Sequence, residues 1–315
     1  MTINPDAAKV VELIKASGRP PYPTVGHIEA RRLYAASRAI LQHDRAPVAE
    51  TRDLAATGPA GPIPLRLYRG MDAPTGGAQP ALIYFHGGGW VLGDIESHDG
   101  VCRDLANAAK CTVISVDYRL APEAKFPASA VDSIAAAEWI WNNAADLGID
   151  RTRLAVGGDS AGGNLSAVVA LHARDTAGAP KLKLQALIYP STDMTTVYPS
   201  YEIHAEQLPL TRVTMDWFVD LYLSNRETDA QHWHASPLRA KNLAGVAPAF
   251  VITAGMDPLR DEGEAFAAKL KEVGVPVTLK RFEGQIHGFI SMGAIIQDAH
   301  VAVRDVAAEL RKAFG

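Results

Sequence analysis

Short runs of apolar residues recur along the chain from about residue 64 onward, and longer segments with helical periodicity separate them. The apolar runs predict strands at 64–69, 81–85, 112–117, 153–157, 184–189, 249–253 and 275–281. Most of these runs are apolar over four or more residues, which is typical of strands buried on both faces of a sheet. Helical patterns follow at 98–110, 128–147, 161–176, 259–273 and 294–313. This alternation predicts an α/β fold built on a mainly parallel, doubly wound sheet.

Two segments depart from the alternation. Residues 1–45 read as helices around a proline-rich break at 20–23 and precede the first predicted strand. Residues 193–236 hold no convincing strand but carry an apolar face behind Thr211, a good helix cap. A plain crossover helix is the alternative, although most such connections are shorter. We expect residues 1–315 to form a single domain in which about 1–45 and 193–236 build a helical cap over a pocket.

The composition is that of a globular protein with a large core. The chain has 315 residues, 48% of them hydrophobic, and its 31 basic and 35 acidic residues leave a net charge of −4. This balance argues against a nucleic-acid partner, which needs a basic face. No apolar run reaches the roughly 18 residues of a membrane span. The N-terminal residues do not resemble a secretory signal, so we expect a cytoplasmic protein.

Cysteine and histidine patterns indicate no metal site. Cys102 and Cys111 are too few for a disulfide framework and lack the spacing of zinc ligands. His232 and His234 alternate as metal ligands can, but no carboxylate or cysteine near them in sequence completes a site. We read both histidines as loop residues and predict neither a metal nor a cofactor.

The most informative stretch is 154–164, where an apolar run ends in a glycine-rich turn and a helical pattern begins. Its centre, Gly158-Asp159-Ser160-Ala161-Gly162, fits the nucleophile elbow Gly-x-Ser-x-Gly. Glycines are needed on both flanks because the serine takes a strained backbone conformation and nearby side chains would collide with neighbouring elements. A phosphate-binding loop is the alternative, but Gly-Lys-Ser/Thr is missing, and a dinucleotide-binding turn would follow the first strand.

A serine hydroxyl is a weak nucleophile unless a base removes its proton. His287 has the best setting for a base, in a glycine-flanked loop just beyond the predicted strand 275–281. Asp257, just beyond the strand 249–253, suits the third role of orienting the imidazole. Ser160, Asp257 and His287 thus all follow the carboxyl ends of predicted parallel strands, where open α/β sheets place their sites. Their order along the chain is the one expected of an α/β-hydrolase.

Other interpretations of these positions stay open. Asp257 precedes Pro258 and could serve only as a helix N-cap. Asp261, Glu262 and Glu283 are rival acids, although the first two fall inside a predicted helix. His287 could be a surface-loop histidine without a catalytic role.

A second glycine-rich segment, HGGGW at 86–90, directly follows the predicted apolar strand 81–85. Successive glycines let backbone amides converge on one point without interference from a Cβ atom. Such amides stabilise the charge that acyl transfer develops on the carbonyl oxygen, and this run is the known companion of the elbow in esterases. We therefore predict an oxyanion hole formed by Gly88, Gly89 and Ala161; a flexible linker is the alternative.

With these pieces in this order, the chain resembles the hormone-sensitive-lipase-like family of α/β-hydrolases, the bacterial family IV esterases. The resemblance rests on HGGGW at 86–90, DYRLAPE at 117–123, GDSAGGN at 158–164, DPLRDE at 257–262 and HGF at 287–289. It implies an eight-stranded, mostly parallel sheet with a helical cap, and it places 118–123 in the scaffold near the site. It also implies hydrolysis of carboxylic esters with short to medium acyl chains. Relatives often form a homodimer through the last strand and helix, which this sequence does not decide.

The expected function is that of a cofactor-independent serine carboxylesterase with a small-molecule ester as substrate. Amide, carbamate or lactone cleavage would use the same triad and stays open. A hormone-binding module, as in the plant gibberellin receptors that resemble this family, lacks the catalytic histidine, so His287 argues against it. The candidates for an apolar acyl slot are Trp90, Leu208, Leu210, Trp217, Phe218 and Phe289.

Overall fold

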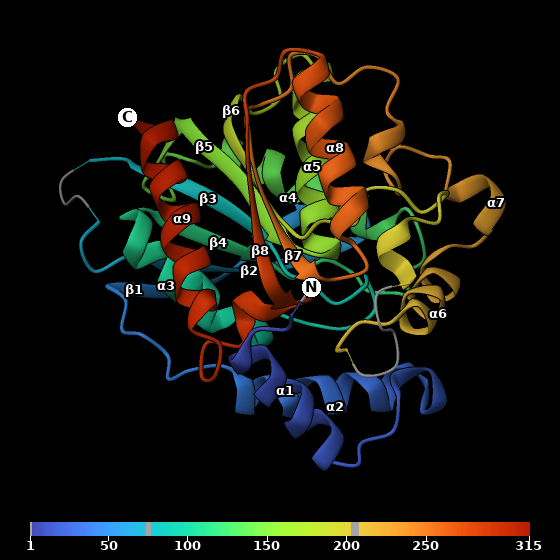
Figure 1. Cartoon of the computed structure of the whole chain (residues 1–315). Coiled ribbons are helices and arrows are strands. Elements are labelled where there is room, and N and C mark those ends of the chain that lie inside the picture. The colour runs from blue at the N-terminus through green and yellow to red at the C-terminus, as the bar shows by residue number, and fades with distance from the viewer. Residues whose placement is uncertain (1, 74–76, 203–207) are drawn as a thin grey trace.

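The computed structural model describes residues 2–73, 77–202 and 208–315 and holds one sheet of eight strands with helices on both faces (Figure 1). Across the sheet the strands follow the order β1-β2-β4-β3-β5-β6-β7-β8. Strand β2 is antiparallel to both of its neighbours, and every other pair is parallel. The eight-stranded, mostly parallel sheet is therefore confirmed. The strands are β1 (Glu50–Gly58), β2 (Gly61–Arg69), β3 (Gln79–Phe85), β4 (Thr112–Val116), β5 (Ile149–Asp159), β6 (Leu182–Ile188), β7 (Ala249–Met256) and β8 (Val277–Ile286).

Strand β1 was not predicted from the apolar pattern, which placed the first strand at 64–69. It lies at the edge of the sheet, where most of its residues are exposed or only half-buried. Its sequence, ETRDLAATG, holds few apolar residues because one side of an edge strand faces solvent. A tight hairpin that pairs Gly58 with Gly61 joins it to β2. Each strand that the apolar runs predict is present in the structure.

The helices divide between the two faces of the sheet. Helices α3 (Asp99–Ala109) and α9 (Gln297–Phe314) pack on one face, and α4 (Ala128–Asn142), α5 (Ala161–Asp175) and α8 (Arg260–Glu272) pack on the other. Strand β3 shows how the pleat serves both layers, since Ile83 packs with the second set of helices and Leu82 and Tyr84 with the first. All of β3 is buried, and every residue after Gln79 is apolar or aromatic, as a strand covered on both faces requires.

The two segments that we expect to form a cap lie together at one side of the sheet. Helices α1 (Pro5–Ala16) and α2 (Gly26–Leu41) form the first, and α6 (Arg212–Tyr222) and α7 (Arg226–Asp229) belong to the second (Figure 1). Helix α6 begins at the predicted Thr211 cap, whose hydroxyl accepts from the Thr214 N–H at 3.2 Å. It packs against the short turn at Tyr22–Thr24 that precedes α2. Residues 203–207 of the second segment lie outside the described residues.

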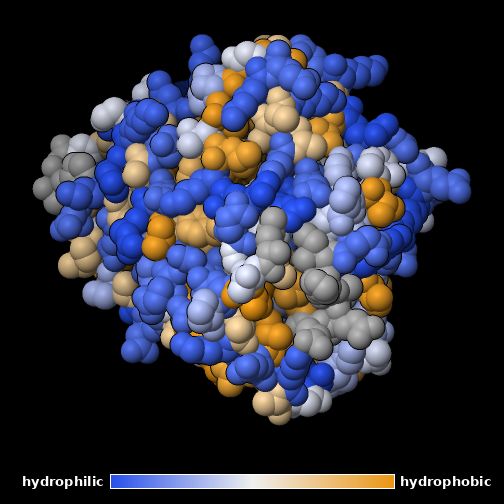
Figure 2. All heavy atoms as spheres, viewed as in Figure 1, coloured by the Kyte–Doolittle hydropathy of each residue, from blue (hydrophilic) through white to orange (hydrophobic). Residues whose placement is uncertain are grey.

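The face of the molecule seen in Figure 1 is largely hydrophilic, with hydrophobic side chains scattered among charged ones (Figure 2). Scattered exposed apolar side chains are normal for a folded protein. Within the described ranges, no helix combines the length and the apolar character needed to cross a bilayer.

A buried carboxyl group, that of Glu262 on α8, anchors the start of the second cap segment. Its Oε1 accepts from the Thr192 N–H at 2.6 Å, and Tyr201 donates its hydroxyl to Oε2. The side chain is fully buried, and burial raises the pKa of Glu262 to about 7 even though these donors favour the ionised form. Folding therefore places a carboxyl group where its charged form is unfavourable.

This burial predicts that stability falls as the pH rises from about 4.5 to about 7. In that interval the Glu262 carboxyl is ionised in the unfolded chain and protonated in the folded one, so folding takes up a proton and each pH step upward disfavours it. The cost reaches about 3 kcal/mol above pH 7. Glu262→Gln mimics the protonated group. We expect its free energy of unfolding in urea to lack this decrease between pH 5 and pH 8.

The matched control is Glu272→Gln, which changes an exposed glutamate of the same helix and should follow the wild-type pH dependence. An unchanged pH dependence in Glu262→Gln would show that the Glu262 carboxyl titrates alike in both states.

Candidate active site

Ser160, His287 and Asp257 form a continuous chain of hydrogen bonds at the carboxyl ends of three strands. The Ser160 Oγ lies 2.9 Å from His287 Nε2, and His287 Nδ1 lies 2.7 Å from Asp257 Oδ2. Asp257 is fully buried and His287 nearly so. With Nδ1 donating to the carboxylate, Nε2 is free to accept the serine proton, which is the arrangement that a general base requires.

Asp257 is not the N-cap of α8, since that position is Leu259 and carries no side-chain cap bond. The second oxygen of Asp257, Oδ1, accepts from the Leu259 N–H at 2.9 Å at the start of α8. This backbone contact fixes the carboxylate while its other oxygen holds His287. The ring of Tyr189, 4.8 Å from the His287 ring between centroids, packs against the imidazole. No sequence pattern indicated this contact.

The rival acids are placed elsewhere. Asp261 accepts from the Ser200 N–H at 2.8 Å, and Glu262 holds the residues at 192–193. Glu283 is largely exposed and lies 3.6 Å from Arg281. Among these four candidate acids, the one hydrogen-bonded to His287 is Asp257.

Ser160 stands at a tight turn between β5 and α5. Its φ of +58° is in the left-handed region that residues with a side chain rarely occupy. The chain can turn there because Gly158 and Gly162 pack against the end of β3. A Cβ atom would lie 2.3 Å from the Phe85 carbonyl oxygen at Gly158 and 1.9 Å from it at Gly162. Both flanking glycines are therefore required by close backbone packing, as the elbow pattern predicts.

The predicted oxyanion-hole residues come from two segments, the turn after β3 and the start of α5. Gly88 and Gly89 have φ values of +130° and +61° and line the same cavity as Ser160 and His287. A Cβ atom on Gly88 would lie 2.1 Å from the Leu92 carbonyl oxygen, so this turn requires glycine. Ala161 is the first residue of α5, where backbone N–H groups have no partner within the helix.

Asp159 connects these two segments, a role that the sequence did not reveal. Its Oδ1 accepts from the Gly87 N–H at 3.0 Å and from the Tyr84 hydroxyl at 2.8 Å, and His98 Nε2 lies 3.3 Å from it. Burial alone would raise the pKa of Asp159, but the neighbouring His98 and the Tyr84 hydroxyl lower it to about 2. The ionised carboxylate thus holds the glycine loop against the elbow.

The expected scaffold at 118–123 supports the same loop. Tyr118 donates its hydroxyl to the His86 carbonyl at 2.7 Å, and its ring stacks on His86 with centroids 4.4 Å apart. Glu123 pairs with Arg31 of α2 at 2.7 Å, and this hydrogen bond lowers the pKa of Glu123 to about 2. The segment therefore connects the glycine loop to the first cap segment.

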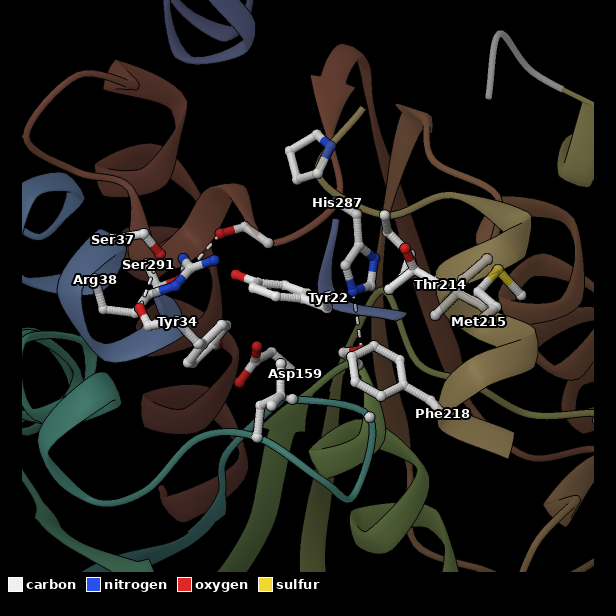
Figure 3. A pocket seen from close by; sticks show the side chains of 18 of the residues that line it. Tyr22, Tyr34, Ser37, Arg38, Asp159, Thr214, Met215, Phe218, His287 and Ser291 are labelled. Atoms are coloured by element: carbon white, nitrogen blue, oxygen red, sulfur yellow. Dashed lines mark hydrogen bonds between the residues drawn. The ribbon is translucent and has the colours of Figure 1, made fainter. Parts of the chain in front are cut away.

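A cavity opens beside Ser160 between the strand ends and the two cap segments (Figure 3). Of the residues predicted for an apolar slot, Trp90, Leu210 and Phe218 line it. On α6 the lining residues form two pairs whose members are four positions apart, which places them on one face of the helix: Thr214 with Phe218, and Met215 with Val219.

The other predicted slot residues lie outside this lining. Trp217 is next to Phe218 in sequence, but neighbouring helix residues point in different directions. Phe289 is fully buried beneath the site, where it packs against Tyr189 and Phe282. Leu208 packs against the core cluster that contains α1, α3 and α9. The slot was predicted from apolar character alone, which does not separate lining residues from core residues.

The first cap segment contributes lining residues that the sequence did not indicate. Tyr22, Tyr34 and Arg38 border the cavity, and in Figure 3 Tyr34 and Arg38 lie on the opposite side of His287 from Met215 and Phe218. Nothing in the local sequence of α2 distinguishes these positions from other helix residues.

His232 and His234 contact each other, with the His234 N–H donating to His232 Nδ1 at 3.1 Å. Burial and the neighbouring His232 lower the pKa of His234 to about 4.

Within the described ranges, the side chains spaced closely enough to hold a metal ion are those of His43, Asp104 and His300, whose ligand atoms lie within 4.8 Å of one another. This group does not line the cavity beside Ser160.

Comparisons with known proteins agree with this geometry. A family described as having the alpha/beta hydrolase fold matches residues 82–291. Carboxylic ester hydrolase LipN of Mycobacterium tuberculosis is 46% identical over 247 residues, which are 77% of this chain and 65% of LipN. Ethyl acetate hydrolase of Pseudomonas putida is 38% identical over 307 residues, 95% of each chain.

Among solved structures, LAE6, an alpha/beta hydrolase enzyme from the metagenome of Lake Arreo in Spain, superposes with a TM-score of 0.95. It is 42% identical, and the match covers 100% of this chain and 99% of LAE6. The matched region contains the glycine loop, the elbow and the residues at 257 and 287. The chain belongs to the hormone-sensitive-lipase-like family of α/β-hydrolases.

Proposed function

We propose that this chain is a serine carboxylesterase that hydrolyses short- to medium-chain carboxylic esters through an acyl-enzyme intermediate. The observation that carries the proposal is the chain of hydrogen bonds from Ser160 through His287 to Asp257 beside the glycine loop. Relatives named carboxylic ester hydrolase and ethyl acetate hydrolase support the same class of reaction.

In the first half of the reaction, Ser160 Oγ attacks the ester carbonyl while His287 Nε2 takes its proton. Asp257 keeps His287 in the tautomer that accepts at Nε2 and stabilises the imidazolium that forms. His287 then protonates the leaving alkoxide, so an alcohol departs and the acyl group stays on Ser160. In the second half, water attacks the acyl group by the same proton route and releases the carboxylic acid.

The carbonyl oxygen gains negative charge in both tetrahedral intermediates. The N–H groups of Gly88, Gly89 and Ala161 would donate to it, and the N-terminal end of α5 adds a favourable dipole. The contacts of Asp159 and the close glycine packing hold both segments, which supports donors that are in place before substrate binds. Preorganised donors of this kind are usually the largest electrostatic contribution to catalysis.

The walls of the cavity support small acyl groups. Trp90, Leu210 and Phe218 are apolar, and the Phe218 ring lies against Gly89 so closely that a Cβ atom there would come within 2.4 Å of it. Trp90 stacks on Tyr222 with centroids 4.6 Å apart, which fixes its position. An apolar slot bounded by such packed rings favours short chains over long ones.

Replacing the nucleophile tests the mechanism. We expect Ser160→Ala to lower kcat for a 4-nitrophenyl butanoate by about 10⁴-fold or more, since the remaining groups cannot form the acyl-enzyme. The folded state should be kept, as judged by circular dichroism and thermal unfolding. Mass spectrometry should find a serine-directed phosphonate on Ser160 of the wild-type protein and no label on the variant.

Hydrolysis by Ser160→Ala near the wild-type rate would rule out this nucleophile. Ser224→Ala, which removes a serine at an exposed position, is the control and should keep the wild-type rate.

A substrate series tests the finer assignment. We expect faster turnover of butanoate and hexanoate esters than of long-chain triglyceride, because the packed rings bound the slot. A 4-nitrophenyl ester should react faster than the matched 4-nitroanilide, since 4-nitrophenol is a better leaving group than 4-nitroaniline. Preference for the long-chain fat or for the anilide, measured as kcat/KM, would contradict the assignment.

A further inference from the structure

One cationic side chain in the active-site cavity has no role in the mechanism above. Arg38 extends from α2 into the cavity and is only 7% exposed. Its Nη1 donates to the Ser291 hydroxyl at 2.5 Å, and its guanidinium carbon lies 4.7 Å from the centroid of the Tyr34 ring. A Cβ atom on Gly288, which follows His287, would lie 3.6 Å from Arg38 Nη2. The guanidinium is therefore next to the loop that carries the candidate base.

The charge of Arg38 is not balanced by a carboxylate. In the part of the chain that the structure describes, no acidic side chain lies within 4.0 Å of it, and its buried Nε has no hydrogen-bond partner. The other arginines of α2 differ, since Arg31 pairs with Glu123 and Arg32 with Glu29. A buried guanidinium without a counter-ion is costly unless something else pairs with it.

The remaining charges around the cavity do not supply that partner. Asp159 also borders the cavity, but its carboxylate is already engaged by the Gly87 N–H, Tyr84 and His98. Arg19 adds a second cationic group at the lining and donates to the Tyr22 hydroxyl at 2.7 Å. In Figure 3, Arg38, Tyr34 and Ser291 gather on one side of His287, and Thr214, Met215 and Phe218 lie on the other. The cavity thus has a cationic side and an apolar side.

We propose that Arg38 forms a carboxylate-binding subsite, so that the preferred esters carry a free carboxylate group remote from the ester that is cleaved. The planar guanidinium matches the two oxygens of a carboxylate, and its charge has no carboxylate partner, while its buried Nε has no hydrogen-bond partner among the described residues. This inference rests on the proposed esterase function and adds a substrate class to it. The carboxylate can belong to the acyl part, as in a monoester of a dicarboxylic acid, or to the alcohol part, as in an acylated hydroxy acid.

A purely structural role for Arg38 makes a different prediction. The bond to Ser291 joins α2 to the turn at Phe289–Ser291, and loss of that bond alone would affect every ester alike. A binding role instead affects only those esters that carry the anion. The comparison between charged and neutral esters of one shape therefore separates the two roles.

The experiment measures kcat/KM by pH-stat titration for two matched pairs of esters. Monoethyl glutarate is compared with ethyl 5-methylhexanoate for the acyl arm, and 3-acetoxypropanoate with isopentyl acetate for the alcohol arm. We expect Arg38→Met to reduce the charged-to-neutral ratio in at least one arm by about tenfold or more, while the neutral ester changes little. Arg38→Lys, which keeps the charge, should retain part of the ratio.

Two further variants complete the test. Ser291→Ala removes the hydrogen bond to Arg38 and should keep the ratio, and Arg32→Met removes a charge from the exposed side of the same helix and should also keep it. If Arg38→Met lowers kcat/KM equally for the charged and the neutral ester in both arms, the inference is overturned and the esterase function stands.

If the wild-type protein hydrolyses none of the four esters, the proposed function is overturned instead. Calorimetric titration of glutarate into Ser160→Ala and into Ser160→Ala/Arg38→Met tests the subsite without turnover. Weaker binding to the double variant supports the subsite, and equal binding overturns it.

Discussion

The candidate site depends on the close approach of two backbone turns, one after β3 and one after β5. The Phe85 carbonyl oxygen lies where a side chain at Gly158 or Gly162 would have to go. Asp159 closes the same contact by accepting from the Gly87 N–H. Because Gly88 and Gly89 come from one turn and Ser160 from the other, this contact sets the distance between the nucleophile and two of the three candidate oxyanion donors.

The parallel sheet supplies the rest of the geometry. Strands β5, β6, β7 and β8 are parallel neighbours, so the residues that follow them emerge at one edge of the sheet. Asp257 follows β7 and His287 follows β8, and each reaches toward the elbow after β5. Two local contacts fix their orientation, the Leu259 N–H on Asp257 and the Tyr189 ring on His287. Side chains far apart in the chain thereby form one hydrogen-bonded series.

The parts predicted from sequence are those whose constraint is local. The elbow is recognisable because a buried strand, a tight turn and a helix start follow one another within a few residues, and the glycine loop because three glycines follow a buried strand after one residue. Strand β1 was missed because an edge strand needs no continuous apolar run. The roles of Asp159 and Arg38 were missed because their contacts join segments distant in sequence, and no local pattern marks them. Trp217 and Phe218 are both large aromatic residues, and only their direction on α6 relative to the cavity decides that Phe218 lines it.

The two cap segments give the cavity an apolar side and a cationic side, while the sheet edge supplies the reacting groups. In this mechanism Ser160 attacks a carbonyl whose oxygen is received by the backbone N–H groups of the two turns. A crystal structure of the protein after reaction with a phosphonate ester tests it most directly. We expect phosphorus bonded to Ser160 Oγ and a phosphoryl oxygen about 2.7–3.1 Å from the backbone nitrogens of Gly88, Gly89 and Ala161. Phosphorus on another residue, or a phosphoryl oxygen directed away from these amides, would contradict it.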